Sequence, residues 1–227
     1  MNERLTEMLG VLAHEMRTPI AAILGYQELL IEGIFGEIDE RSEEPLGRIA
    51  YSAKQLLYLI DGVQEVLSPA EKRLEINPEL FDPAPVLRSC VANATTDAHG
   101  RNVVLSQSVN GELPRVHGDP DRFCRAIDLA LSAALKVSHG STIRVGAEAV
   151  DGAIQISIAG TALVPGRDDP RMTDLRDASQ RPLTGAGLRL AIVRHLAQQM
   201  DGDIALEPDG TLRIEIDPKT RPNKPTQ

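Results

Sequence analysis

The sequence predicts an α+β chain: a long helical hairpin, which would form a four-helix bundle on dimerisation, followed by an α/β sandwich. Apolar residues recur at steps of three and four from residue 2 to residue 67, which is typical of amphipathic helices. After Ser68-Pro69 the pattern changes to alternating strands and helices. The expected divisions are a dimerisation hairpin at 1–68, a sandwich domain at 69–216 and a disordered, Pro- and Lys-rich tail at 217–227.

Residues 2–32 predict one helix with a kink near Pro19. Its apolar stripe consists of Leu5, Met8, Leu9, Leu12, Met16, Ile20 and Ile23. At about 100° per residue, His14 projects almost opposite this stripe, and Thr18 lies on the same outward face one turn later. A proline inside a helix costs about 3 kcal/mol. The pattern is therefore unusual for a helix face that is merely solvated.

A second helix is expected to start near Ser42, which supplies a capping hydroxyl, with Pro45 near the first turn. Its apolar positions are Leu46, Ile49, Ala50, Ala53, Leu57, Ile60, Val63 and Leu67. Two antiparallel amphipathic helices cannot bury both stripes alone, so a homodimeric four-helix bundle is expected. The alternative is that the hairpin packs on its own C-terminal domain.

The second half predicts a sandwich with helices on one face of a mixed sheet. Strands are expected at 74–76, 103–105, 142–145, 154–158 and 212–216, and helices from 83 through 94, 121–137 and 187–200. Asp151-Gly152 is expected to be the turn between two of these strands.

The composition limits the partners that the protein can have. Asp and Glu outnumber Lys and Arg 33 to 24, which disfavours nucleic acid as a partner. No apolar run approaches the 18 or so residues of a membrane span, and no signal peptide is recognisable, so a cytoplasmic protein without membrane contact is expected. Cys90 and Cys124 are too few for a disulfide framework or a zinc site, and two reduced thiols and no metal are expected.

The octet Ala-His-Glu-Met-Arg-Thr-Pro-Ile at residues 13–20 carries the most specific motif. Together with its flanks it resembles the H-box of sensor histidine kinases. The resemblance implies that His14 is phosphorylated, that Glu15 tunes the imidazole and that Thr18 helps to place a water for dephosphorylating a partner. Such kinases usually carry a sensory segment before the H-box. The chain is therefore expected to be either natively free of an input segment or an excised core.

The second half resembles the ATP-binding domain of the same kinases. Residues 118–122 resemble the entry to the N-box helix, 134 and 136 its end, 185–188 the second glycine box, with Gly185 and Gly187, and 200–204 the turn beyond. Four departures follow. Leu129 and Ala133 stand where the N-box has asparagines, Ala-Gly160-Thr-Ala-Leu replaces the first glycine box, and Arg189 replaces a third glycine. Magnesium requires oxygen ligands, so no nucleotide or metal is expected to bind this domain.

These observations lead to the hypothesis of a phosphorelay protein, a histidine phosphotransferase that exchanges phosphoryl groups between His14 and response-regulator receiver domains without its own ATP-dependent autophosphorylation. Neutral imidazole is a competent nucleophile near pH 7. Glu15 would orient the ring or take its proton, and the receiver would bring Mg²⁺. Arg17 would contact the phosphoryl group or the receiver, or be a solvated charge. Two alternatives remain open: an ATP-dependent histidine kinase with a diverged nucleotide site, and a catalytically silent dimer that binds receivers or a kinase.

Overall fold

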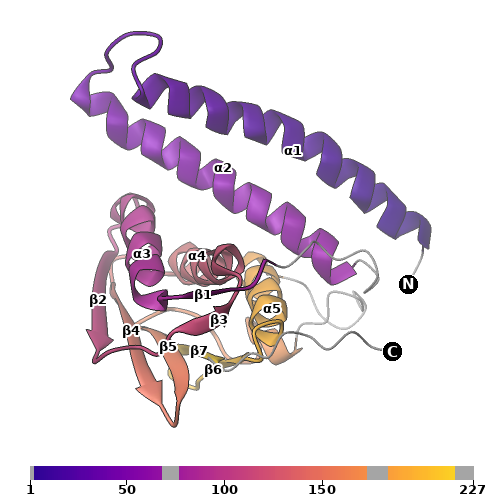
Figure 1. The fold of residues 1–227 in the computed structure, drawn as a ribbon, viewed down its shortest axis with the longest axis vertical. Coiled ribbons are helices and arrows are strands. Elements are labelled where there is room, and N and C mark those ends of the chain that lie inside the picture. The colour runs from indigo at the N-terminus through magenta and orange to yellow at the C-terminus, as the bar shows by residue number, and fades with distance from the viewer. Residues whose placement is uncertain (1–2, 68–76, 173–183, 218–227) are drawn as a thin grey trace. The chain divides into compact units, whose positions relative to one another are not determined.

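The computed structural model describes residues 3–67, 77–172 and 184–217. The chain divides into two compact units, residues 1–74 and residues 75–227. Both predicted parts of the chain, a helical hairpin and an α/β sandwich, are present (Figure 1). In the part of the chain that is described, no helix combines the length and the apolar character needed to cross a membrane.

The first unit is a hairpin of helix α1 (Glu3–Ile31) and helix α2 (Glu40–Leu67). Helix α1 continues through Pro19 without a break. The expectation that Ser42 caps the second helix is wrong: α2 begins at Glu40, and its cap is Asp39, three residues before Ser42. The Asp39 carboxylate accepts a hydrogen bond from the backbone N–H of Arg41 at 3.2 Å, which satisfies one of the N–H groups that a helix start leaves without a partner.

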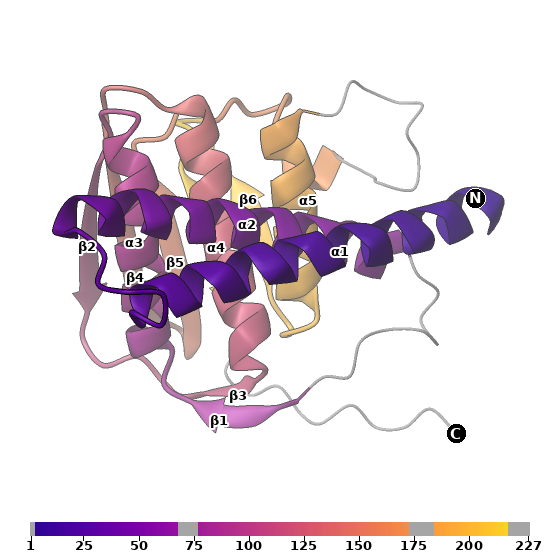
Figure 2. The same ribbon diagram turned by 90° about the horizontal axis from the view of Figure 1, so that it is seen from above.

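The second unit has a five-stranded sheet in the order β2-β4-β5-β7-β6. Its strands are β2 (Val104–Asn110), β4 (Thr142–Val150), β5 (Ala153–Ala159), β6 (Asp203–Leu206) and β7 (Leu212–Ile216). Strands β2 and β4 are parallel, and the other neighbours are antiparallel. Figure 2 shows helices α3 (Pro83–His99), α4 (Pro120–Val137) and α5 (Gly185–Gln198) side by side on one face. The expectation of helices on one face of a mixed sheet is confirmed.

The core of this unit lies between the sheet and the three helices. Buried and less buried residues alternate along β5, as expected for a strand with one face on a core. Asp151 and Gly152 connect β4 and β5 with φ of 51° and 86°. Two positive φ values in succession are the signature of a tight hairpin turn, so the sequence located this turn correctly.

Four short elements were not foreseen from the sequence, one of which is the four-residue strand β6 of the main sheet, where only a turn was expected. Strands β1 (Glu79–Phe81) and β3 (Val116–Gly118) pair antiparallel in a small second sheet, and Pro170–Met172 form a 3₁₀ turn. Elements of three or four residues are too short to show a clear period, which explains why they were missed. The strand expected at 74–76 lies outside the described residues.

Candidate functional site

The H-box residues lie on α1, and their side chains are accessible. His14, Glu15 and Thr18 are all exposed, whereas the preceding Ala13 is 5% exposed. Their accessibility follows from the helical period, because the inward positions of α1 are taken by Ala13 and Ile20. An incoming phosphoryl group can therefore approach the imidazole without displacing a packed side chain.

Arg17 takes part in an ion pair within the hairpin. Its guanidinium donates to the carboxylate of Asp61 on α2 at 2.6 Å and to the side-chain oxygen of Gln64 at 3.2 Å. The sequence suggested either a contact with the partner or a solvated charge, and neither included this pairing across the hairpin. A receiver contact by Arg17 stays a prediction, and such a contact would have to compete with Asp61.

An apolar groove of about 210 Å³ lies between α1 and α2, and residues of α1 before and after His14 line it. It is lined by Leu9, Leu12, Ala13, Met16, Leu59, Ile60, Val63 and Gln64. Several large apolar side chains of the same two helices remain 41–60% exposed in a single chain, namely Met8, Val11, Leu12, Met16, Ile23, Ile49 and Leu56. An exposed apolar surface of this kind marks an interaction face.

In the second unit, the two N-box positions do not fit a magnesium ion. Leu129 and Ala133 are both 0% exposed and form part of the core of α4. Magnesium takes oxygen ligands, and hydrocarbon side chains offer none. No step of a mechanism can therefore be assigned to a magnesium ion held at these two positions.

The first turn of α5 keeps several groups that suit an anionic ligand. Thr184 caps the helix by accepting from the N–H of Gly187 at 2.8 Å. The Lys136 side chain lies against Gly185, where a Cβ would come within 2.6 Å of its Cε. A helix N-terminus carries a partial positive charge, and a nearby lysine adds a full one. Phosphate groups would be favoured there without the two asparagines of the N-box.

Arg189 adds a second cation to this end of α5. Its Nε donates to the hydroxyl of Ser132 on α4 at 3.1 Å, and its Nη1 donates to the carbonyl of Gly185 at 2.8 Å. The residue that replaces the third glycine thus lies between the glycine box and the N-box helix. Its charge is held next to the N-terminus of α5.

Gly160, in the degenerate first glycine box, has a structural requirement of its own. Its φ is 79°, and a Cβ at this position would lie 2.3 Å from the carbonyl oxygen of Thr142. Only glycine combines this backbone conformation with so close an approach. The glycine therefore allows the chain that leaves β5 to pass close to the first residue of β4.

Sequence reasoning missed the role of Asp168, whose side chain is fully buried. Its carboxylate accepts the N–H of Val164 at 3.0 Å, the hydroxyl of Thr184 at 2.9 Å and the Arg167 guanidinium at 2.8 Å. Burial raises the pKa of Asp168, but these hydrogen bonds outweigh it and hold the pKa below its usual value. An isolated acid in a loop gives no periodic signal, so this link to the cap of α5 could not be read from the sequence.

Comparison with known proteins agrees with this geometry. Residues 4–66 match the family described as His Kinase A (phospho-acceptor) domain, and residues 118–222 match the Histidine kinase-, DNA gyrase B-, and HSP90-like ATPase family. An uncharacterized sensor-like histidine kinase of Rhizobium meliloti is 25% identical over 223 residues, which cover 94% of this chain and 42% of that protein. Histidine protein kinase DivJ of Caulobacter vibrioides is 27% identical over 208 residues, 88% of this chain and 34% of that protein.

Solved structures share the fold. Histidine kinase AdeS of Acinetobacter baumannii superposes with a TM-score of 0.55 at 22% identity, covering 91% of this chain and 98% of that one. Full-length ShkA in complex with AMPPNP superposes with a TM-score of 0.60 at 23% identity, covering 96% of this chain and 47% of that one. The chain spans less than half of the length of the curated relatives named above.

A phosphoacceptor hairpin followed by an ATPase-type sandwich defines a class of signalling proteins. The chain has the domain pair of a two-component histidine kinase core. This finding corrects the expectation of a phosphorelay protein that lacks ATP-dependent autophosphorylation. That expectation counted the altered side chains of the N-box and of the two glycine boxes, but residues 118–222 still match the ATPase family. The backbone N–H groups of α5 and the cations Lys136 and Arg189 do not depend on those ligands.

Proposed function

We propose that the chain is the catalytic core of a sensor histidine kinase, in which ATP bound to the second unit phosphorylates His14. One observation carries the proposal: an exposed histidine in a phosphoacceptor hairpin and an ATPase-type domain lie on one chain in kinase order. The relatives named above are described as histidine kinases and as a sensor-like histidine kinase, which supports the same reaction here.

The reaction is a phosphoryl transfer to nitrogen. A ring nitrogen of neutral His14 forms a bond to the γ-phosphorus of ATP as the bond to the bridging oxygen breaks, and ADP leaves. Glu15 is the adjacent group that would orient the ring or accept its proton. Phosphoryl transfer depends mainly on positioning and charge stabilisation, so Lys136, Arg189 and the first turn of α5 are expected to hold the phosphates despite the altered N-box.

A second transfer would move the group to a receiver. The carboxylate of a receiver aspartate would attack the phosphorus on His14, forming a P–O bond as the P–N bond breaks. The imidazole would leave in its neutral form, with its proton kept on the ring or returned to it by Glu15. Mg²⁺ brought by the receiver would complete this step.

Thr18 is proposed to place the water that hydrolyses the receiver's aspartyl phosphate. Thr18→Ala would therefore lengthen the lifetime of that phosphate and leave labelling of His14 intact.

The hairpin is proposed to pair with a second copy in a four-helix bundle. The apolar groove and the exposed apolar side chains of α1 and α2 support this proposal, because a second hairpin would cover them. Light scattering at micromolar concentration should give the mass of a dimer. A monomer under these conditions would contradict the proposal.

The decisive experiment offers the protein two phosphoryl donors separately: γ-labelled ATP with magnesium, and a phosphorylated receiver domain. We expect label from ATP in an acid-labile linkage, abolished in His14→Ala. His139→Ala is the matched control, because His139 is exposed and lies in the other unit. His14→Ala removes an exposed side chain, so it should change stability by less than about 0.5 kcal/mol. Labelling from the receiver alone, or from neither donor, would overturn the proposed kinase.

A further inference from the structure

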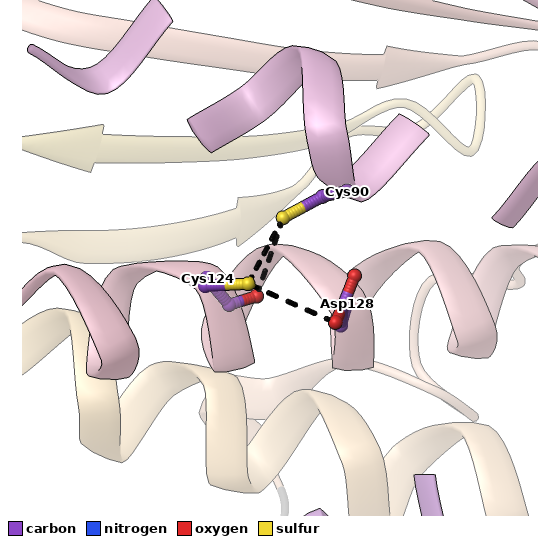
Figure 3. Close-up of side chains that lie close together, drawn as sticks. All are labelled: Cys90, Cys124 and Asp128. Atoms are coloured by element: carbon purple, nitrogen blue, oxygen red, sulfur yellow. Dashed lines mark hydrogen bonds between the residues drawn. The ribbon is translucent and has the colours of Figure 1, made fainter. Parts of the chain in front are cut away.

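Two cysteines and an aspartate that the proposed reaction does not use meet between α3 and α4. The Sγ atoms of Cys90 and Cys124 are 3.3 Å apart, and Asp128, one turn further along α4, places Oδ2 3.9 Å from the Cys124 sulfur. Figure 3 shows the three side chains converging from the two helices. Their candidate ligand atoms all lie within 4.8 Å of one another.

We propose that Cys90, Cys124 and Asp128 form a binding site for a thiophilic divalent cation of the zinc class. The site could not be expected from the sequence pattern, because 34 residues separate the cysteines. The fold brings them together by packing α3 against α4. The site is separate from His14 and from the first turn of α5.

The donor set selects the class of metal. Thiolate ligands favour zinc and similar soft cations over magnesium or calcium, which take oxygen ligands. Zinc binds sulfur at about 2.3 Å and carboxylate oxygen at about 2.0–2.2 Å, so a tetrahedral site needs an S···S distance of about 3.8 Å and an S···O distance of about 3.6 Å. The observed distances of 3.3 Å and 3.9 Å differ from these by about 0.5 Å and about 0.3 Å, and the remaining pair, Cys90 and Asp128, lies within 4.8 Å. Small rotations of the side chains would bring the three donors to bonding distance.

The burial of the cluster leaves one side open for entry and for a further ligand. Cys90 is 0% exposed and Asp128 is 4% exposed, but Cys124 is only partly buried. Three protein ligands plus a water on the accessible side would complete a four-coordinate ion. A site of this kind takes up and releases its metal more readily than one with four protein ligands.

The composition of the cluster favours a metal over a disulfide. The carboxylate of Asp128 is buried and lies 3.9 Å from the Cys124 sulfur, and a disulfide would give it no role. A divalent cation uses all three side chains, since it displaces the thiol protons and compensates the negative charge of the ligands.

The test uses the full chain, freed of metal and kept reduced with a phosphine, titrated with Co²⁺ as a spectroscopic probe. We expect one Co²⁺ per chain, a thiolate-to-cobalt charge-transfer band, release of about two protons per ion and displacement of the band by Zn²⁺. The metal should also raise the midpoint of thermal unfolding, because it binds only the folded state.

Two variants and one control make the test specific. Cys124→Ala should abolish the charge-transfer band and the shift in melting temperature. Asp128→Asn should weaken Co²⁺ binding at least about tenfold, because even the loss of a residue that only orients a ligand costs about 10–100-fold in affinity. Asp121→Asn is the control, because Asp121 is an exposed acid on the same helix. The proposal fails if the reduced protein gives no band, if the band persists in Cys124→Ala, or if Asp121→Asn and Asp128→Asn behave alike. Formation of a Cys90–Cys124 disulfide by a protein that binds no Co²⁺ would also overturn it.

Discussion

Replacing Asp168 with asparagine tests whether the buried carboxylate holds the cap of α5 in place. The carboxylate accepts from Val164, Thr184 and Arg167 at 2.8–3.0 Å, with its side chain fully buried. Asparagine keeps one acceptor oxygen and turns the other position into a donor. Hydrogen bonds to charged groups contribute about 1.5–3 kcal/mol each. With one such bond lost and another weakened, Asp168→Asn should reduce the free energy of unfolding by about 2–3 kcal/mol.

The pH dependence gives this prediction a second readout. The pKa of Asp168 is lowered in the folded state, so its stabilisation is fully present above the unfolded value of about 3.9 and is lost as pH falls through the folded pKa. The difference between wild type and Asp168→Asn, measured by urea unfolding, should therefore be constant from pH 7 to about pH 5 and shrink below about pH 4. Asp169→Asn is the neighbouring control. The reasoning is refuted if both variants unfold alike at pH 7, or if the difference does not change with pH.

Three further predictions concern individual residues. Gly160→Ala should lower the free energy of unfolding by at least about 1–2 kcal/mol for the left-handed backbone alone, and by more because the Thr142 carbonyl must move. The comparison is Gly152→Ala, which is also at positive φ but has open space around it. Equal losses of stability in the two variants would contradict the close approach of Gly160 to Thr142. Arg17→Gln and Asp61→Asn should show a coupling of less than about 1 kcal/mol in a double-mutant cycle, since the pair is partly exposed; a coupling of zero would mean that the pair does not stabilise the hairpin. Arg189→Ala should weaken ATP binding in calorimetry by about tenfold, equivalent to about 1.4 kcal/mol, whereas Arg194→Ala, whose side chain pairs with Asp203, should not; unchanged affinity in Arg189→Ala would remove Arg189 from the phosphate site.

The sequence predicted those features of the fold that have a period. The hairpin, the mixed sheet and the Asp151-Gly152 turn all follow from apolar spacing or turn chemistry, and all are present. Strands β1 and β3, of three residues each, are stabilised by their mutual pairing rather than by a pattern of their own. Local reasoning cannot detect an element whose stability comes from residues more than thirty positions away.

The same limit applies to the candidate sites. The sequence predicted correctly that His14 is exposed, because its exposure follows from helical geometry. The ion pair of Arg17 with Asp61, the link between Asp168 and Thr184, and the approach of Cys90 to Cys124 each join residues that only the tertiary fold brings together. The error of the phosphorelay hypothesis had a different origin. It treated the loss of ligand side chains as the loss of the site, although backbone donors and neighbouring cations also bind phosphate.

The ion pair between Arg17 and Asp61 also gives the hairpin a preferred register. A slide of α1 along α2 by one helical turn, about 5.4 Å, would take the guanidinium out of reach of the carboxylate, and it would carry His14 by the same distance. For a partly exposed pair worth up to about 1 kcal/mol, the pair by itself favours this register by no more than about fivefold. A shift of the phosphoacceptor along α2 would have to break this pair and also repack the buried apolar side chains of the hairpin, Ala13 and Ile20 among them.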